Sequence, residues 1–340
     1  INIIYKEIEI FNEFINLKKD LNSLIKKEKI DAIKLSSLTK EISFLFENHN
    51  IPYLVLKGIP LSIQTTGYEN SRGLGDLDIL IDKNNLKKSI RLLKKYNFEF
   101  TFGSTLDTKS IYSNYEKFVG TQVSLFRYRN GIFQSIDLHW RISIVRGIFP
   151  EFYKLWEKKE EYNIHGQKVY TLSKKDAFLH SCLHSQVDNW MYLRDLVDII
   201  RLSRNFKKSD FKNPDIKVLE SSTLVAYDLF PNKFFLSLNT RFTKSQISRI
   251  KKNAHYFQKS KWRKECGNMY GFFNYFYKFK KLLFYNTRLL SINFNLINLI
   301  TISLFNFINP RRLIDKSSGK ILSPIKIFNN LMGSLLGLSK

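Results

Sequence analysis

The strongest constraint on the fold is a short strand pattern at residues 76–81, in which two aspartates alternate with aliphatic side chains. Asp76 and Asp78 alternate with Leu77 and Ile79, and successive side chains of a β-strand point to opposite faces. One face of the strand is therefore apolar, and the other carries two carboxylates about 7 Å apart. Two carboxylates at this separation can share divalent ions, which in turn hold phosphate groups.

The segment before this strand favours a ligand site over a structural turn. Aspartate is common where a loop meets a strand, because its side chain accepts hydrogen bonds from loop amides. Here, however, an apolar strand at residues 51–56 ends in Lys57-Gly58, and a helix-like segment follows. Glycine at a strand-to-helix turn lets the backbone approach a phosphate, and a helix N-terminus favours anions. The combination predicts a metal site that holds a triphosphate.

A third carboxylate, Asp137, lies in a second alternating strand at residues 133–141. Its apolar and polar side chains fall on opposite faces: Ile136, Leu138 and Trp140 on one, and Ser135, Asp137, His139 and Arg141 on the other. A solvent-facing edge strand would show the same alternation. Because the chain contains both acid-bearing strands, we favour a centre of three carboxylates.

These motifs resemble the nucleotidyltransferase superfamily typified by DNA polymerase beta. Within it, LKG, Arg72, GDLDILID and SIDLHWRI are similar to a bacterial group of uncharacterised nucleotidyltransferases, over about residues 35–200. The resemblance implies that Asp76 and Asp78 ligate the metal, Mg²⁺ or Mn²⁺. It also implies that Asp137 completes the metal site and takes the acceptor's proton.

The glycine turn departs from the superfamily pattern. Gly-Ser or Gly-Gly is usual at this turn, with the acids following more closely, whereas Ile59-Pro60 follows Gly58 here and Asp76 comes eighteen residues after Gly58. Phosphate recognition by a turn serine is therefore not expected. Nucleotide binding is assigned instead to Lys57, the Gly58 backbone and Arg72.

The resemblance implies an enzyme that transfers a nucleoside monophosphate from an NTP, such as ATP, to an acceptor with release of pyrophosphate. The acceptor is left open among nucleic acid, protein and small molecules. The alternative is a noncatalytic protein that binds nucleic acid or a membrane surface on the same scaffold, and the three intact acids argue against it. A small-molecule kinase is less favoured, because neither a catalytic-loop Asp with a downstream Asn nor a Walker lysine is present.

The positive charge of the chain is concentrated near its C-terminal end. The 340 residues carry a formal charge of +25, and residues 241–340 contain nineteen Lys or Arg against two acids. Between residues 241 and 288 these basic residues interleave with aromatic ones. Such a mixture suits RNA, an anionic membrane surface, or helices that pack on the catalytic region.

Residues 289–308 contain no charged side chain and have the length of a membrane span. Four Asn, two Ser and one Thr interrupt the run, so we favour an interfacial or buried helix over a span. Cys182 and Cys266 lie far apart, and the N-terminus shows no signal-peptide pattern. These features predict a cytoplasmic protein, with peripheral attachment to the membrane as an alternative.

Two histidines share one face of a predicted helix. His180, His184 and Asp188 are four residues apart, a spacing that can bind zinc. No general-base Glu follows His180 and no further ligand motif is evident, so we interpret the three as packed helix residues. Three charged residues further along are expected to pair within the same helical region: Arg194, Asp195 and Asp198.

The predicted fold class is α+β, a mixed-sheet nucleotidyltransferase core flanked by N-terminal and C-terminal helices. Four parts are expected: a helical segment at 1–50, the catalytic core at 51–172, a helical region packed on the core at 173–240, and a basic, aromatic-rich helical region at 241–340. Within the core, the patterns predict a helix at Asn84–Tyr96 with an Asn cap, strands at 98–102, 122–128 and 132–141, and a hairpin turning at His165-Gly166.

Overall fold

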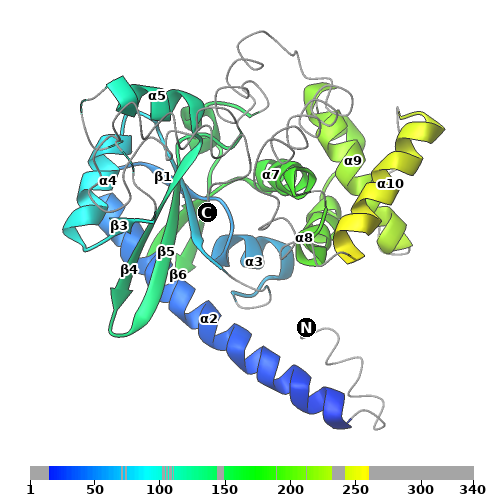
Figure 1. Ribbon diagram of the computed structural model, residues 1–340, viewed down its shortest axis with the longest axis horizontal. Helices are drawn as coiled ribbons and strands as arrows, with labels where there is room; N and C mark the ends of the chain where they lie inside the picture. The colour runs from blue at the N-terminus through cyan, green and yellow to red at the C-terminus, as the bar shows by residue number, and fades with distance from the viewer. Residues whose placement is uncertain are drawn as a thin grey trace, which may run out of the picture.

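The computed structural model describes residues 15–259, except residues 70–71, 73–74, 102–103, 105, 107–108, 110, 144–148, 189, 212 and 232–241. Its central element is a seven-stranded mixed sheet with the strand order β3-β4-β5-β2-β1-β7-β6. The sheet is flanked by helices from both ends of the described chain (Figure 1). The predicted α+β class with a mixed sheet is confirmed.

The strands are β1 (Tyr53–Val55), β2 (Leu77–Ile81), β3 (Glu99–Phe100), β4 (Gln122–Arg129), β5 (Ile132–His139), β6 (Glu160–Ile164) and β7 (Gln167–Thr171). Two neighbouring pairs are parallel, β2 with β5 and β1 with β7, and the other four are antiparallel. The described helices are α2 (Ile15–Asn48), α3 (Ile59–Thr66), α4 (Leu86–Lys95), α5 (Ile111–Val119), α6 (Phe152–Trp156), α7 (Lys174–Val187), α8 (Leu193–Ser203), α9 (Asn213–Leu229) and α10 (Lys244–Lys259), with a 3₁₀ turn η1 (Lys208–Asp210).

The two faces of the sheet pack against different helices. In β1, Tyr53 and Val55 belong to an apolar cluster shared with α2 and α4, whereas Leu54 belongs to a cluster shared with α7, α8 and α9. In β2 the same alternation places Ile79 in the first cluster and Leu80 in the second. Asp78 lies two residues before Leu80 and points to the same face of the sheet, which is the face that α7 and α8 approach.

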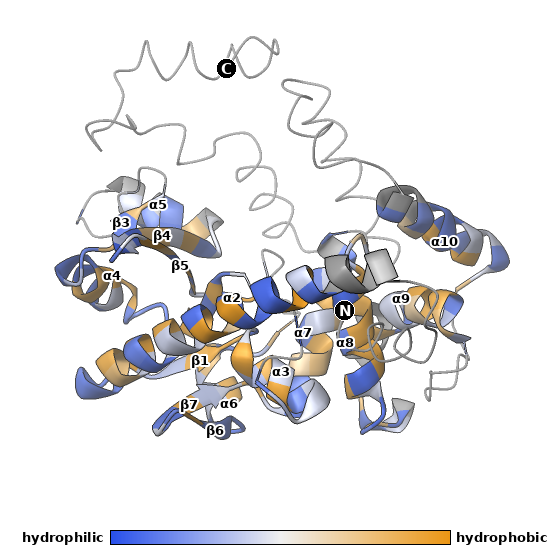
Figure 2. Cartoon of the chain, turned by 90° about the horizontal axis from the view of Figure 1, so that it is seen from below, coloured by the Kyte–Doolittle hydropathy of each residue, from blue (hydrophilic) through white to orange (hydrophobic). Residues whose placement is uncertain are grey.

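The helices show the pattern expected of elements with one packed side. Hydrophilic and hydrophobic residues alternate in bands along α2 and α10 (Figure 2). The buried residues of α2 recur at helical spacing: Leu35, Leu38, Ile42, Leu45 and Phe46. Helix α2 ends at Asn48, close to the predicted boundary at residue 50, and Asn50 takes a positive φ of 50°.

The predicted hairpin is confirmed, and the predicted helix cap is wrong. His165 and Gly166 join β6 to β7 with φ angles of 50° and 83°, as a two-residue hairpin turn requires. Helix α4 starts at Leu86, and the side chain of Asn85 before it makes no capping hydrogen bond. Asp82 accepts a hydrogen bond from the Asn84 backbone N–H at 2.8 Å, which forms an aspartate turn just before the helix.

Several sequence predictions lie outside the described residues. These are the uncharged run at 289–308, Cys266, and all of the basic region after residue 241 except residues 242–259. None of the helices that the structure does describe combines the length and apolar character needed to cross a bilayer. Cys182 is a free, buried thiol in α7.

The turn between β1 and α3 depends on glycine. Gly58 has a φ of +69°, and a Cβ atom on it would lie 3.3 Å from Leu35 Cδ2. We expect Gly58→Ala to lower the free energy of unfolding by about 1–3 kcal/mol, because a side chain is strained in this conformation. A Cβ on Gly75 would meet no atom within 4 Å. Gly75→Ala should therefore change the free energy of unfolding by less than about 0.5 kcal/mol. Urea unfolding that gives both variants the same stability would contradict this account of the turn.

Candidate metal and nucleotide site

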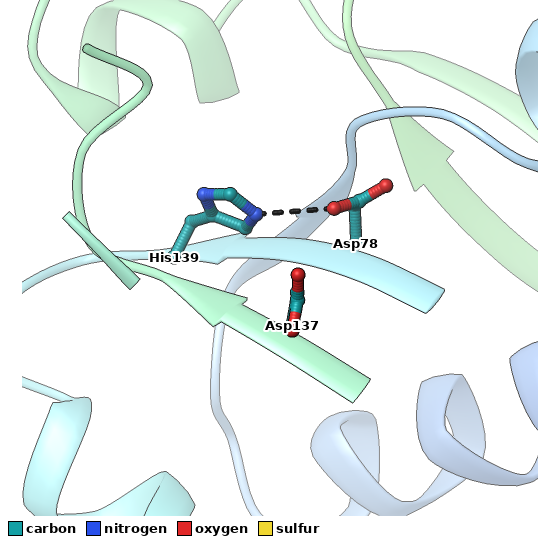
Figure 3. A group of neighbouring side chains, drawn as sticks. All are labelled: Asp78, Asp137 and His139. Atoms are coloured by element: carbon teal, nitrogen blue, oxygen red, sulfur yellow. Dashed lines mark hydrogen bonds and ion pairs between the residues drawn. The ribbon is translucent and has the colours of Figure 1, made fainter. Parts of the chain in front are cut away.

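The parallel pairing of β2 with β5 brings two of the predicted acids together. Asp78 on β2 lies directly opposite Asp137 on β5 in the register of the two strands. Residues opposite each other in a sheet point to the same face, and both carboxylates project from the same side (Figure 3). The opposite face is fully apolar at the neighbouring positions, which are all buried: Leu77, Ile79, Ile136 and Leu138.

His139 and Gln122 complete the polar contacts of these carboxylates. The Nε2 atom of His139 lies 3.2 Å from Asp78 Oδ1, and Gln122 Nε2 donates to Asp137 Oδ2 at 2.7 Å. One ligand atom each from Asp78, Asp137 and His139 lies within 4.8 Å of the others. The sequence pattern predicted that His139 shares a strand face with Asp137, but it did not predict His139 as a site residue.

The charge of Asp78 is stabilised despite its burial. Burial raises the pKa of this carboxyl, but the hydrogen bond and charge of His139, together with the charge of Lys57, outweigh it and lower the pKa to about 2. Asp78 is therefore ionised at neutral pH, which is the form that binds a cation.

Asp76 lies near the pair but is not part of the close group. It precedes β2 and its side chain is exposed. Loss of solvation raises the pKa of Asp76, and the charges of Asp137 and Asp78 raise it further. The three carboxylates therefore repel one another, and a divalent cation would relieve this repulsion. The sequence predicted a pair along one strand, Asp76 with Asp78, whereas the close pair in the structure joins Asp78 with Asp137 across two strands.

Lys57 lies beside these acids at the end of β1. The backbone N–H of Leu56 donates to the backbone oxygen of Asp78 at 3.0 Å, so Lys57, the next residue, lies near the start of β2. Burial lowers the pKa of Lys57, while the charges of Asp78 and Asp195 raise it. A lysine ammonium next to paired carboxylates is placed to bind a phosphate that arrives with a cation.

Gly58 is the N-terminal capping residue of α3, which has Pro60 in its first turn. The first backbone N–H groups of a helix have no partner within it, so they can bind an anion. The positions of Lys57 and Gly58 therefore agree with the predicted role in nucleotide binding. That role itself stays a prediction.

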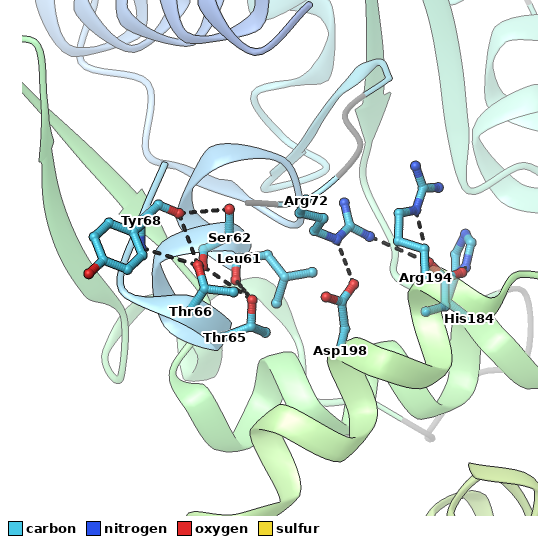
Figure 4. Close-up of polar contacts among 10 residues, drawn as sticks. Leu61, Ser62, Thr65, Thr66, Tyr68, Arg72, His184, Arg194 and Asp198 are labelled. Atoms are coloured by element: carbon cyan, nitrogen blue, oxygen red, sulfur yellow. Dashed lines mark hydrogen bonds and ion pairs between the residues drawn. The ribbon is translucent and has the colours of Figure 1, made fainter. Parts of the chain in front are cut away.

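Arg72 lies in the segment before β2 and pairs with helix α8. Its Nε donates to Asp198 Oδ2 at 2.5 Å and its Nη2 to Asp195 Oδ1 at 3.4 Å (Figure 4). All three side chains are 5% exposed or less. The expected pairing within the helix is therefore only partly right: Arg194 Nε is 3.5 Å from Asp195 Oδ1, but Asp198 pairs with Arg72. A contact between Arg72 and a nucleotide stays a prediction.

A second group of side chains of the types that ligate metals lies at the C-terminal end of α7 and the start of α8. His184 Nδ1 is 3.5 Å from Asp188 Oδ2 and 3.4 Å from Asp195 Oδ2. His180 is not a member: its ring centroid is 6.1 Å from that of His184, and its side chain is buried. Burial, together with the charge of Lys57, holds the pKa of His180 well below its usual value, so the ring is neutral.

A sequence model of uncharacterised nucleotidyltransferases matches residues 6–219 of this chain. The chain belongs to this family. The match includes both acid-bearing strands, the Lys57-Gly58 turn and helices α7 and α8. An antigenic nucleotidyltransferase-like protein from Paracoccidioides brasiliensis is similar in structure, with 15% identity and a TM-score of 0.36, over 58% of this chain and 89% of that chain. No curated protein matches the chain.

Removing one partner of the buried ion pair of Arg72 is expected to destabilise the protein strongly, because it leaves buried charges unpaired. Arg72→Met leaves Asp195 and Asp198 without their shared cation, and removing one partner of a buried pair costs about 3–5 kcal/mol. Arg129 is the matched control, because it pairs with Glu41 at 2.9 Å but its side chain is 57% exposed. Arg129→Met should cost less than about 1 kcal/mol. Chemical denaturation measures both variants, and an equal loss would show that Arg72 does not act as a buried pair.

Proposed function

We propose that this protein is a metal-dependent nucleotidyltransferase that transfers a nucleoside monophosphate from an NTP to an acceptor and releases pyrophosphate. Membership of the family supports the general reaction. The observation that supports the metal-dependent form most directly is the opposition of Asp78 and Asp137 on adjacent parallel strands, with their carboxylates on one face.

The donor atoms at this face fit a hard divalent cation. Carboxylate oxygens are the ligands that Mg²⁺ and Mn²⁺ prefer, and Asp76, Asp78 and Asp137 would supply them. His139 contacts Asp78 and would orient its carboxylate. When bound, a divalent ion neutralises triphosphate charge and makes an acceptor hydroxyl more acidic.

The other residues of the face would position the nucleotide. Lys57 and the first N–H groups of α3, after Gly58, would bind the phosphates that leave as pyrophosphate. Arg72 would add positive charge to this region while holding α8 in place through Asp195 and Asp198. Most of the rate would then come from positioning and from charge stabilisation.

Asp137 would serve the acceptor rather than the nucleotide. Gln122 holds one of its oxygens at 2.7 Å and so fixes the direction of the carboxylate. Its oxygens would help to bind the ion nearest the acceptor and would receive the acceptor's proton. The acceptor class is open among nucleic acid, protein and small molecules. The basic residues 241–340 would favour an anionic acceptor such as RNA, or would bind the protein to an anionic membrane surface.

Asp137→Asn should reduce the rate of nucleotidyl transfer on the order of a thousandfold or more while largely retaining NTP binding, because it removes the proton acceptor and one metal ligand. The measurement uses α-labelled NTPs with Mg²⁺ or Mn²⁺ in cell extract, followed by identification of the labelled product. Ser135→Ala is the matched control, since Ser135 lies on the same face of β5 two residues earlier. Near wild-type turnover of Asp137→Asn would remove this residue from the proposed mechanism.

Calorimetry separates binding from turnover in the same set of variants. Asp78→Asn should abolish metal-dependent NTP binding, because Asp78 would hold the ion that binds the triphosphate. Unchanged affinity for Mg-NTP in this variant would overturn the proposed metal site.

A further inference from the structure

We propose that α7 and α8 form a second divalent-cation site, made by His184, Asp188 and Asp195, that takes a first-row transition metal of the zinc class. The site shares no residue with the Asp78 and Asp137 pair. It goes beyond the proposed nucleotidyl transfer and does not rest on it. One imidazole with two carboxylates is a donor set that suits Zn²⁺ better than Mg²⁺.

The distances from His184 to the two carboxylates match those between ligands of a tetrahedral ion. His184 Nδ1 lies 3.5 Å from Asp188 Oδ2 and 3.4 Å from Asp195 Oδ2. One ligand atom from each of the three residues lies within 4.8 Å of the others. Tetrahedral bonds of about 2.0–2.1 Å place neighbouring ligand atoms roughly 3.3–3.4 Å apart. The side chains therefore need little movement to surround one ion.

Two atoms of the group are buried without a hydrogen bond. Among the described residues, neither His184 Nδ1 nor Asp195 Oδ2 makes a hydrogen bond of good geometry, and both atoms are shielded from solvent. They face each other as an ion pair at 3.4 Å. The Asp195 side chain is only 5% exposed. Buried polar atoms are rarely left unsatisfied, because an unpaired one costs about 1–3 kcal/mol. A cation between them would satisfy both atoms at once.

The surroundings of Asp195 are those of a metal ligand held by outer contacts. Its Oδ1 atom faces Arg72 Nη2 at 3.4 Å and Arg194 Nε at 3.5 Å, which leaves Oδ2 directed toward His184. Arg72 and Arg194 reach the part of α8 that lies beside His184 (Figure 4). Partners of this kind orient a ligating carboxylate. Asp198 also pairs with Arg72, so the arginines do not cancel the negative charge of the group.

The group is open to entry of an ion. The side chains of His184 and Asp188 are 39% and 32% exposed. Three protein ligands would leave the fourth position of a tetrahedral ion to water, the arrangement of zinc sites that keep an open position. Lys57 is close enough to Asp78, Asp195 and Asp188 for their charges to raise its pKa against the effect of burial. A second ion would therefore lie beside the proposed phosphate site.

The test measures metal binding by the full chain after removal of any affinity tag and treatment with chelator. The Asp78→Asn, Asp137→Asn double variant lacks two carboxylates of the first site, so an ion that this variant still binds is assigned to the second site. Equilibrium dialysis with Zn²⁺ should find one ion per chain, and Co²⁺ in its place should give the intense visible absorption of a tetrahedral complex. Adding His184→Gln or Asp188→Asn should weaken Zn²⁺ binding at least about 10- to 100-fold, since loss of a mere outer contact of a ligand already has an effect of that size.

His165→Gln is the matched control, because His165 is 58% exposed and faces Glu69 at 3.6 Å in another part of the molecule. The Asp188 side chain is 32% exposed, so Asp188→Asn should leave the thermal unfolding of the metal-free chain nearly unchanged. His184→Gln also removes a contact of the buried Asp195, so its loss of Zn²⁺ is read beside that of Asp188→Asn. In the chain with Asp78 and Asp137 intact, the same two variants should lose one Zn²⁺ relative to the wild type. Failure of the double variant to bind Zn²⁺, or a loss no larger than that of His165→Gln, would overturn the proposal.

Discussion

The parallel pairing of β2 with β5 is the constraint on which the rest of the site depends. It sets Asp78 opposite Asp137 because the apolar residues between the acids are buried on the face covered by α2 and α4. A shift of one residue in either strand would turn an acid into that core and an aliphatic side chain toward α7. The hydrophobic effect thus fixes the register, and the register brings two like charges together.

The helices behind this face are held by a buried ion pair rather than by apolar contact alone. Arg72 comes from the segment before β2 and reaches Asp195 and Asp198 on α8, so the strand that carries the acids is bonded to the helix that faces them. Buried ion pairs add little net stability compared with apolar packing, but they fix relative position. Lys57 lies close to both sets of carboxylates, since the charges of Asp78, Asp195 and Asp188 all raise its pKa.

The local features of the fold could be predicted from the sequence, and the tertiary ones could not. Alternation in β2 and β5 identified both acid-bearing strands, because a period of two is a local property. The spacing of His180, His184 and Asp188 was interpreted as that of packed helix residues, but the structure groups His184 and Asp188 with Asp195 from α8. No sequence spacing encodes that packing of two helices. The predicted cap of α4 is absent, and Asp82 forms a turn just before the helix.

The most direct test of the account is the position of the metal and nucleotide in crystals grown with Mn²⁺ and a nonhydrolysable NTP analogue. Anomalous diffraction locates Mn²⁺ independently of any assumption about its ligands. The account predicts a Mn²⁺ peak roughly 2.1 Å from carboxylate oxygens of Asp78 and Asp137, with the triphosphate beside Lys57 and the start of α3. A nucleotide bound elsewhere, or no peak between β2 and β5, would contradict it.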